Sequence, residues 1–253
     1  MKDRIELLNI NIDNITLNDL LNSYKQGVIV TPNLDHMMLL QQNKLMHNAY
    51  NNADYITVDS QILFLVLKFL GKPVKEKICG SDFLPAYCNF HKDNNDIRIF
   101  LLGAAPGVAE IAANKINHRT GRDIIIGHHS PSMSFVNDES ECNDVINMIN
   151  QTNANVLVVG LGAPKQEIWI DKYKDKFTNI HSFMALGATI DFESGIITRA
   201  PKWMSKLGLE WLYRLTLEPG RLWKRYLVTD TQFFILIIKD LLGLYKPPFK
   251  EKK

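Results

Sequence analysis

Residues 156–170 read VLVVGLGAPKQEIWI and contain the strongest structural signal in this chain. The four apolar, mostly β-branched residues at its start predict a buried parallel strand. Gly160 and Gly162 allow a tight turn after that strand, and Pro164 suits the first turn of a helix. A strand, a glycine turn and a helix start form the usual ligand edge of an α/β domain, where free N–H groups attract phosphate. The polar residues 165–167 in that turn therefore predict a binding site.

Apolar runs alternate with helical patterns along the first 195 residues. We expect strands at 28–31, 55–58, 97–102, 123–126, 156–160 and 181–186. We expect helices at 34–51, 61–70, 108–119, 139–151 and 164–176, with several more after residue 200. This alternation predicts an α/β fold with a Rossmann-like, doubly wound, mostly parallel sheet. Ligands bind outside the carboxyl ends of the strands in such a sheet, so the residues that end each strand are the candidate site.

Charge is distributed unevenly along the 253 residues, although the net charge is only +2. Residues 196–253 carry 12 Lys/Arg and 5 Asp/Glu, a net of +7, and residues 1–195 carry 17 and 22, a net of −5. This asymmetry predicts that the C-terminal part meets a membrane surface, nucleic acid or a phosphorylated substrate. Three cysteines without metal-ligand spacing favour a reduced cytosolic compartment, and the N-terminus lacks a signal-peptide core.

The C-terminal part predicts a helical appendage, residues 196–253, on an α/β core formed by residues 1–195. Trp203, Leu207, Trp211 and Leu215 fall at four-residue steps, and a second helical pattern covers residues 233–242. Its longest apolar run is far shorter than the ~20 residues that span a bilayer. Basic residues interleaved with aromatic ones suit an amphipathic segment in the membrane interface. The alternative is an ordinary helical pair that packs on its own domain.

Polar residues at the strand ends are the candidates for chemistry. Asp59 suits a general base, a ribose ligand or a helix cap. Thr31 and Asn33 bracket a proline, and Asn33 suits the cap of the helix from residue 34. The segment Gly103-Ala104-Ala105-Pro106-Gly107 follows a strand and opens a helix, so it suits a phosphate or ribose cradle, but it lacks both G-x-G-x-x-G and a Walker lysine.

Charged residues near the end of the core and in the appendage are a second group. Arg214 shares a helix face with apolar Leu207, so we expect it to meet an anion or a buried carboxylate. Arg225 suits a phosphate ligand or a solvated surface position. The pair Asp191 and Glu193 is similar to the D-x-D of metal-dependent sugar transferases, but two acids at this spacing arise easily by chance. We therefore predict no metal site.

Taken in order, the strand-end motifs resemble the WecG/TagA/CpsF family of bacterial glycosyltransferases (glycosyltransferase family 26), from about residue 5 to residue 226. The motifs that carry the resemblance are Thr31-Pro32-Asn33, Asp59, Gly80-Ser81-Asp82, Leu101-Leu102-Gly103, Gly162-Ala163-Pro164-Lys165-Gln166-Glu167, Gly187-Ala188 with Asp191, and Arg199-Ala200-Pro201 leading to Glu210-Trp211-Leu212-Tyr213-Arg214.

The resemblance implies an inverting, metal-independent transferase without a cofactor. Such an enzyme moves N-acetylmannosamine, its uronic acid or glucose from a UDP-sugar to a polyprenyl-diphosphate-linked saccharide. Its products feed wall teichoic acid, enterobacterial common antigen, capsule or exopolysaccharide. The resemblance also implies peripheral attachment to the inner face of the plasma membrane through the appendage. A nucleic-acid partner is not expected, and a homo-oligomer is left open.

Residue roles follow from the same resemblance. It implies that Asp59 is the catalytic base, that Thr31 and Asn33 line the sugar and acceptor pocket, and that Arg214 neutralises the departing diphosphate together with Arg221. Lys77 stands where many relatives have arginine before the Gly-Ser-Asp motif. The expected substrate-binding residues are Gln166, Asp191, Gly103, Ala104, Gly162, Lys77, Arg221 and Arg225. The alternative function is a nucleotide-binding regulatory module that its basic tail anchors to lipid or to a partner.

Overall fold

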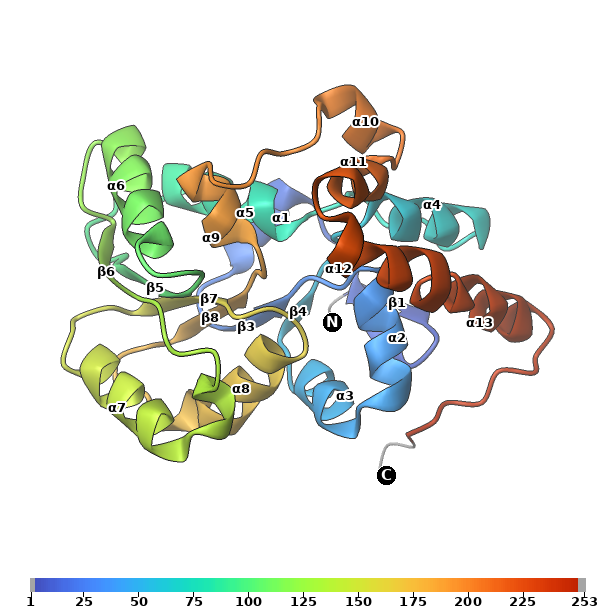
Figure 1. Cartoon of the computed structure of the whole chain (residues 1–253), viewed down its shortest axis with the longest axis horizontal. Helices are drawn as coiled ribbons and strands as arrows, with labels where there is room; N and C mark the ends of the chain where they lie inside the picture. Colours follow the sequence, from blue (N-terminus) through green and yellow to red (C-terminus); the bar gives the residue numbers. More distant parts are fainter. Residues whose placement is uncertain (1–2, 250–253) are drawn as a thin grey trace.

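A six-stranded sheet forms the centre of the molecule (Figure 1). The computed structural model describes residues 3–249, without the side chains of Lys202, Lys206 and Arg221. The strands are β3 Gly27–Val30, β4 Tyr55–Ile56, β5 Ile99–Gly103, β6 Ile125–His129, β7 Val156–Gly160 and β8 Ser182–Ala185. They lie in the order β4-β3-β8-β7-β5-β6, and every neighbouring pair is parallel. The predicted doubly wound sheet is confirmed.

Helices cover both faces of this sheet (Figure 1). Alternate residues along each strand point to opposite faces, and they belong to two separate buried clusters: Leu157 and Val159 to one, Val156 and Val158 to the other. The first cluster is completed by residues of α2 Leu34–Gln42, α3 Lys44–Asn51, α4 Gln61–Phe69, α7 Glu139–Asn150 and α8 Lys165–Tyr173. The second is completed by residues of α1 Leu17–Ser23, α5 Gly80–Phe90, α6 Val108–Thr120 and α9 Thr189–Ser194.

Two predicted helices are broken in the structure. The helix expected at 34–51 is two helices, because Asn43 leaves the helical region (φ −117°, ψ 104°) and its side chain caps α3 by accepting the Met46 N–H. The pattern from Trp203 to Leu215 predicted one helix, which is also wrong. There α10 Lys202–Lys206 and α11 Glu210–Leu217 are separated at Gly208, whose φ of +75° is the left-handed conformation that favours glycine.

Several strand bounds and short elements differ from the prediction. The edge strand β6 begins at Ile125 rather than at 123 and runs on through the polar pair His128 and His129, which an edge strand tolerates because one of its sides is unpaired. The N-terminal hairpin was not predicted, because its strands, β1 Arg4–Leu7 and β2 Ile10–Asp13, have only four residues each. Helices α1 and α9 were missed for the same reason of length.

The C-terminal part continues after α11 with α12 Pro219–Lys224, a π-helical turn η3 Arg225–Thr229 and α13 Gln232–Leu241. Phe233 and Ile237 of α13 are buried in the first core cluster, whereas Ile238 and Leu242 are exposed. One face of the predicted amphipathic segment therefore packs on its own domain. Within residues 3–249, no helix has the length and apolarity needed to cross a bilayer. The domain boundary at residue 195 stays a prediction.

Candidate active site

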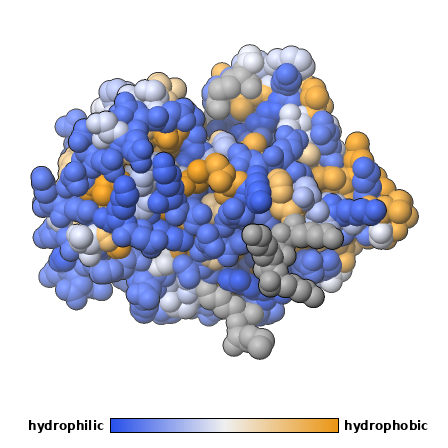
Figure 2. Space-filling view, turned by 90° about the horizontal axis from the view of Figure 1, so that it is seen from below, coloured by the Kyte–Doolittle hydropathy of each residue, from blue (hydrophilic) through white to orange (hydrophobic). Residues whose placement is uncertain are grey.

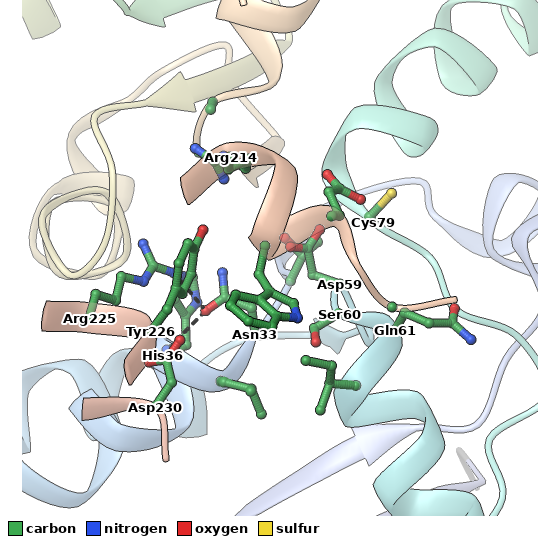
Figure 3. Close-up of a pocket in the computed structure, with 18 of the residues that line it drawn as sticks. Asn33, His36, Asp59, Ser60, Gln61, Cys79, Arg214, Arg225, Tyr226 and Asp230 are labelled. Atoms are coloured by element: carbon green, nitrogen blue, oxygen red, sulfur yellow. Dashed lines mark hydrogen bonds between the residues drawn. The ribbon is translucent and has the colours of Figure 1, made fainter. Parts of the chain in front are cut away.

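A cavity of about 390 Å³ lies at the carboxyl ends of β3, β4, β7 and β8. This is the edge at which parallel α/β sheets bind ligands, and the volume suits a small molecule. The C-terminal part closes the cavity with residues of α11, η3 and α13 (Figure 3). Its polar and charged lining residues are Thr31, Asn33, His36, Asp59, Ser60, Gln61, Cys79, Ser81, Gln166, Thr189, Glu210, Trp211, Arg214, Arg225, Tyr226, Asp230 and Thr231.

Asp59 stands just after β4 and points into this cavity (Figure 3). It does not cap the helix that follows, because Ser60 does so by accepting the Leu63 N–H. Instead Asp59 Oδ1 accepts the N–H of Gly80, the first residue of α5, at 3.2 Å. Desolvation raises the pKa of Asp59 to about 6, against the lowering effect of this hydrogen bond. The group can thus be protonated and deprotonated near neutral pH, as a general base requires.

Arg214 supplies positive charge on the appendage side of the cavity (Figure 3). It is half-buried, and its Nε is buried without a hydrogen-bond partner among the described residues. The guanidinium carbon lies 5.9 Å from the centre of the Phe192 ring. A buried guanidinium donor without a protein partner is a candidate for binding an anionic ligand. The positive charge also lowers the pKa of Asp59.

Arg225 is bound to the core rather than solvated. Its Nη2 donates to Asn33 Oδ1 at 3.4 Å, and its Nε lies 3.4 Å from Asp35 Oδ2. Asn33 caps α2 as predicted, accepting the His36 N–H at 3.2 Å. Asp230 is buried close by, and burial raises its pKa to about 6. These contacts join the appendage to the end of β3.

Gln166 lines the cavity from the first turn of α8. Its Oε1 accepts the N–H groups of Gly162 (3.3 Å) and Gly187 (3.1 Å), so it connects the loops after β7 and β8. Its Nε2 donates to Glu167 Oε1 at 2.8 Å. Both side chains are buried, and burial raises the pKa of Glu167 to about 7. Lys165, the third polar residue of this turn, is exposed.

Sequence reasoning missed several lining residues, His36, Glu210 and Asp230 among them. Glu210 begins α11, and its negative charge raises the pKa of Asp59. His36 lies in the first turn of α2, and its Nδ1 is 2.8 Å from the buried hydroxyl of Tyr50. The sequence did contain a feature that could have indicated His36 as a site residue. It follows Asn33 by three residues, which places it on the first turn of a helix that begins at a strand end.

A profile of the WecG/TagA/CpsF family of glycosyl transferases matches residues 5–247. The chain belongs to this family. A relative from Bacillus spizizenii is 31% identical, over 90% of this chain and 85% of its own length. A relative from Bacillus subtilis is 30% identical, over 85% of this chain and 80% of its own length. A Staphylococcus aureus relative shares 25% identity over 88% of this chain and 86% of its own length. All three are named N-acetylglucosaminyldiphosphoundecaprenol N-acetyl-β-D-mannosaminyltransferase. The predicted resemblance and the predicted transferase class are confirmed.

Not every residue singled out in this WecG/TagA/CpsF chain reaches the cavity. The expected site residues that do not line it are Gly103, Ala104, Gly162, Lys77 and Asp191. Lys77 still lowers the pKa of Asp59 through its charge. The Arg221 side chain lies outside the described residues. The roles of these residues remain predictions.

The two acidic residues considered as metal ligands, Asp191 and Glu193, have different surroundings. Glu193 is paired with Arg119 at 2.7 Å, and Asp191 lies in the first turn of α9. In the described part of the chain, no three His, Cys, Asp or Glu side chains are grouped as metal ligands would be.

Proposed function

We propose that this chain is an inverting, metal-independent glycosyltransferase that moves N-acetylmannosamine from its UDP derivative to polyprenyl-diphosphate-linked N-acetylglucosamine. The observation that carries the proposal is the presence of Asp59 and Arg214 in one cavity at the strand ends. One is a carboxylate with a raised pKa, and the other is a guanidinium whose buried Nε has no partner among the described residues. The names of the relatives support this sugar and this acceptor over the uronic acid and glucose.

The reaction is a single displacement. Asp59 removes the proton from the acceptor hydroxyl, whose oxygen attacks the anomeric carbon of the donor sugar. The bond from that carbon to the diphosphate oxygen breaks, UDP leaves from the opposite face, and the configuration inverts. Arg214 and Arg225 compensate the charge that develops on the leaving diphosphate, and Arg221 is proposed to help them. Fixed cations at this position do electrostatically what a divalent metal does in other transferases.

The remaining predicted residues position the substrates. Thr31 and Asn33 follow β3, line the cavity with Asp59, and are proposed to hold the acceptor sugar. Gln166 keeps the loops after β7 and β8 together, which shapes the donor side of the cavity. Asp191, at the start of α9, is proposed to lie near the nucleotide.

Mass spectrometry of the products tests this proposal. Purified protein would be incubated with synthetic polyprenyl-diphosphate-N-acetylglucosamine and each UDP-sugar in turn. We expect N-acetylmannosamine transfer, with UDP released only when the lipid acceptor is present. Transfer of another sugar would refute the proposed donor, and UDP binding without any transfer would favour a regulatory module. Asp59→Asn should reduce turnover by roughly 10³-fold or more, as loss of a general base does.

A matched control for Asp59→Asn is Asp13→Asn. Asp13 is also a buried carboxylate, and its Oδ2 accepts the N–H of Ile56 in β4, the strand that leads to Asp59. It does not line the cavity. A loss of turnover in the Asp59 variant alone, with equal thermal unfolding temperatures, would assign the effect to chemistry rather than to folding.

We further propose that the exposed apolar residues of α13 and α4 rest on the inner face of the plasma membrane. Hydrophobic atoms gather at the right-hand edge of Figure 2, the side on which α13 and α4 lie in Figure 1. Ile235, Ile238 and Leu241 of α13 are each more than half exposed. Apolar side chains beside basic residues suit a membrane interface. Replacing these three by Asn should reduce co-sedimentation with anionic liposomes. Met133→Asn, an exposed apolar residue elsewhere, should leave it unchanged.

A further inference from the structure

His36 is a cavity residue whose ring the structure holds in one orientation. It is 7% exposed, lines the cavity from α2, and comes from the same turn as Asn33. Its Nδ1 faces the hydroxyl of Tyr50 on α3 at 2.8 Å, and Glu167 Oε1 lies 4.0 Å away. No hydrogen bond joins its Nε2 to another described residue. This nitrogen is also absent from the described polar atoms that are both buried and unpaired. The Nε2 edge is therefore free to meet a ligand.

The contact with Tyr50 decides which ring nitrogen carries the proton. Tyr50 is fully buried, and its hydroxyl hydrogen needs an acceptor. Within residues 3–249 the acceptor in hydrogen-bond contact with that hydroxyl is His36 Nδ1. Tyr50 O–H therefore donates to Nδ1, and the proton of the neutral ring is on Nε2. His36 presents a hydrogen-bond donor to the cavity.

The surroundings also keep this donor uncharged. Burial is the main cause that lowers the pKa of His36 to about 3, and the positive charge of Arg225 lowers it further. The donors that line the cavity thus include the guanidinium groups of Arg214 and Arg225, which suit phosphate oxygens, and a neutral imidazole N–H. A neutral donor is suited to an uncharged oxygen, because its hydrogen bond to a phosphate oxygen is weaker than that of a cationic donor.

We infer that His36 is a specificity-determining residue, whose Nε2–H donates a hydrogen bond to an uncharged oxygen of a bound sugar, either a hydroxyl or an N-acetyl carbonyl. Tyr50 is the positioning residue that holds the ring in this tautomer. The inference rests on the proposed transferase function. The sugar belongs to the donor or to the acceptor, and the two sources are separated by kinetics with one substrate varied at a time.

The test compares His36→Leu with His36→Gln. Leu fills the space without a donor, whereas the Gln amide can place an N–H close to the position of Nε2. We expect His36→Leu to lower kcat/KM about tenfold or more for the substrate whose sugar His36 contacts, because a neutral hydrogen bond to that substrate is lost. His36→Gln should recover kcat/KM to within about threefold of the wild type. His47→Leu is the matched control, because His47 is a buried histidine of α3 that does not line the cavity.

Two further readouts separate this role from folding and from the reaction itself. In ¹⁵N NMR spectra, the wild-type His36 ring should show the Nε2–H tautomer, and Tyr50→Phe should shift it toward a mixture. Equal losses for His36→Leu and His36→Gln, or an Nδ1–H tautomer in the wild type, would overturn the inference. A wild-type protein that transfers no sugar would instead refute the proposed function, and the NMR result would stand independently of it.

Discussion

The raised pKa of Asp59 makes a quantitative prediction about the pH dependence of transfer. With a pKa of about 6, roughly 9% of the base is ionised at pH 5 and roughly 91% at pH 7. The value of kcat/KM should therefore rise about tenfold between these two pH values and be nearly constant above pH 7. An aspartate at the ordinary value of 3.8 would change the rate by less than about 10% over the same range. The two cases are easily separated.

The assay is UDP release at low substrate concentration from pH 5 to pH 9, since kcat/KM reports the ionisation of the free enzyme. Glu210→Gln removes a negative charge that raises the pKa of Asp59, so the acidic limb should move to lower pH. Lys77→Met removes a positive charge that lowers it, so the limb should move to higher pH. A rate that is flat between pH 5 and pH 7 would refute the assignment of Asp59 as a base with a raised pKa.

Two other carboxyl groups titrate in the same range and require controls. Burial raises the pKa of Glu167 to about 7 and that of Asp230 to about 6. If Asp59 is responsible for the acidic limb of the pH profile, the midpoint of that limb should stay near pH 6 in Glu167→Gln and in Asp230→Asn, whatever these changes do to the maximum rate. Loss of the limb in either variant would assign it to that residue.

Three further predictions concern stability. Because the pKa of Glu167 rises on folding from 4.5 to about 7, its ionisation should lower the free energy of unfolding by on the order of 3 kcal/mol as the pH rises through that window. Urea unfolding at pH 5 and pH 8 should show a smaller fall in Glu167→Gln than in the wild type, and the fall that remains belongs to Asp59 and Asp230, whose pKa values are also raised. Gly103→Ala should destabilise the fold by about 2 kcal/mol or more in thermal melts, because φ is +125° there and a Cβ would collide with the backbone of Gly160. Phe233→Ala should cost about 3–5 kcal/mol in the same assay, because Phe233 is fully buried in the first core cluster.

Buried strands and strand-end residues were the features that could be predicted from the sequence. Strand β7 has the predicted bounds because a central parallel strand is apolar on both faces, and that leaves a continuous run in the sequence. Asp59, Thr31 and Asn33 were found because parallel topology brings the carboxyl ends of separate strands to one edge. The expectation for Arg214 rested on a helix face shared with Leu207; that helix is broken at Gly208, yet Arg214 does line the cavity, from α11.

Features that depend on packing between distant segments could not be predicted in the same way. The donor proton of His36 depends on Tyr50, and the orientation of Gln166 depends on glycine N–H groups from two loops. The break at Asn43 was missed because an asparagine within a helical pattern is only weakly unfavourable, whereas its cap contact with Met46 is visible only in three dimensions.

The cavity is assembled from segments that leave the ribosome at very different times. The core part of its lining comes from residues 31–81 and 166–192, whereas the residues that close it, from Gly208 to Phe234, are synthesised after every strand of the sheet. N-terminal regions fold first during synthesis, so a nascent chain can complete its sheet before the site exists. A chain that terminates early, near residue 200, would carry Asp59 at an open edge of the sheet, without Arg214 and the other residues that close the cavity.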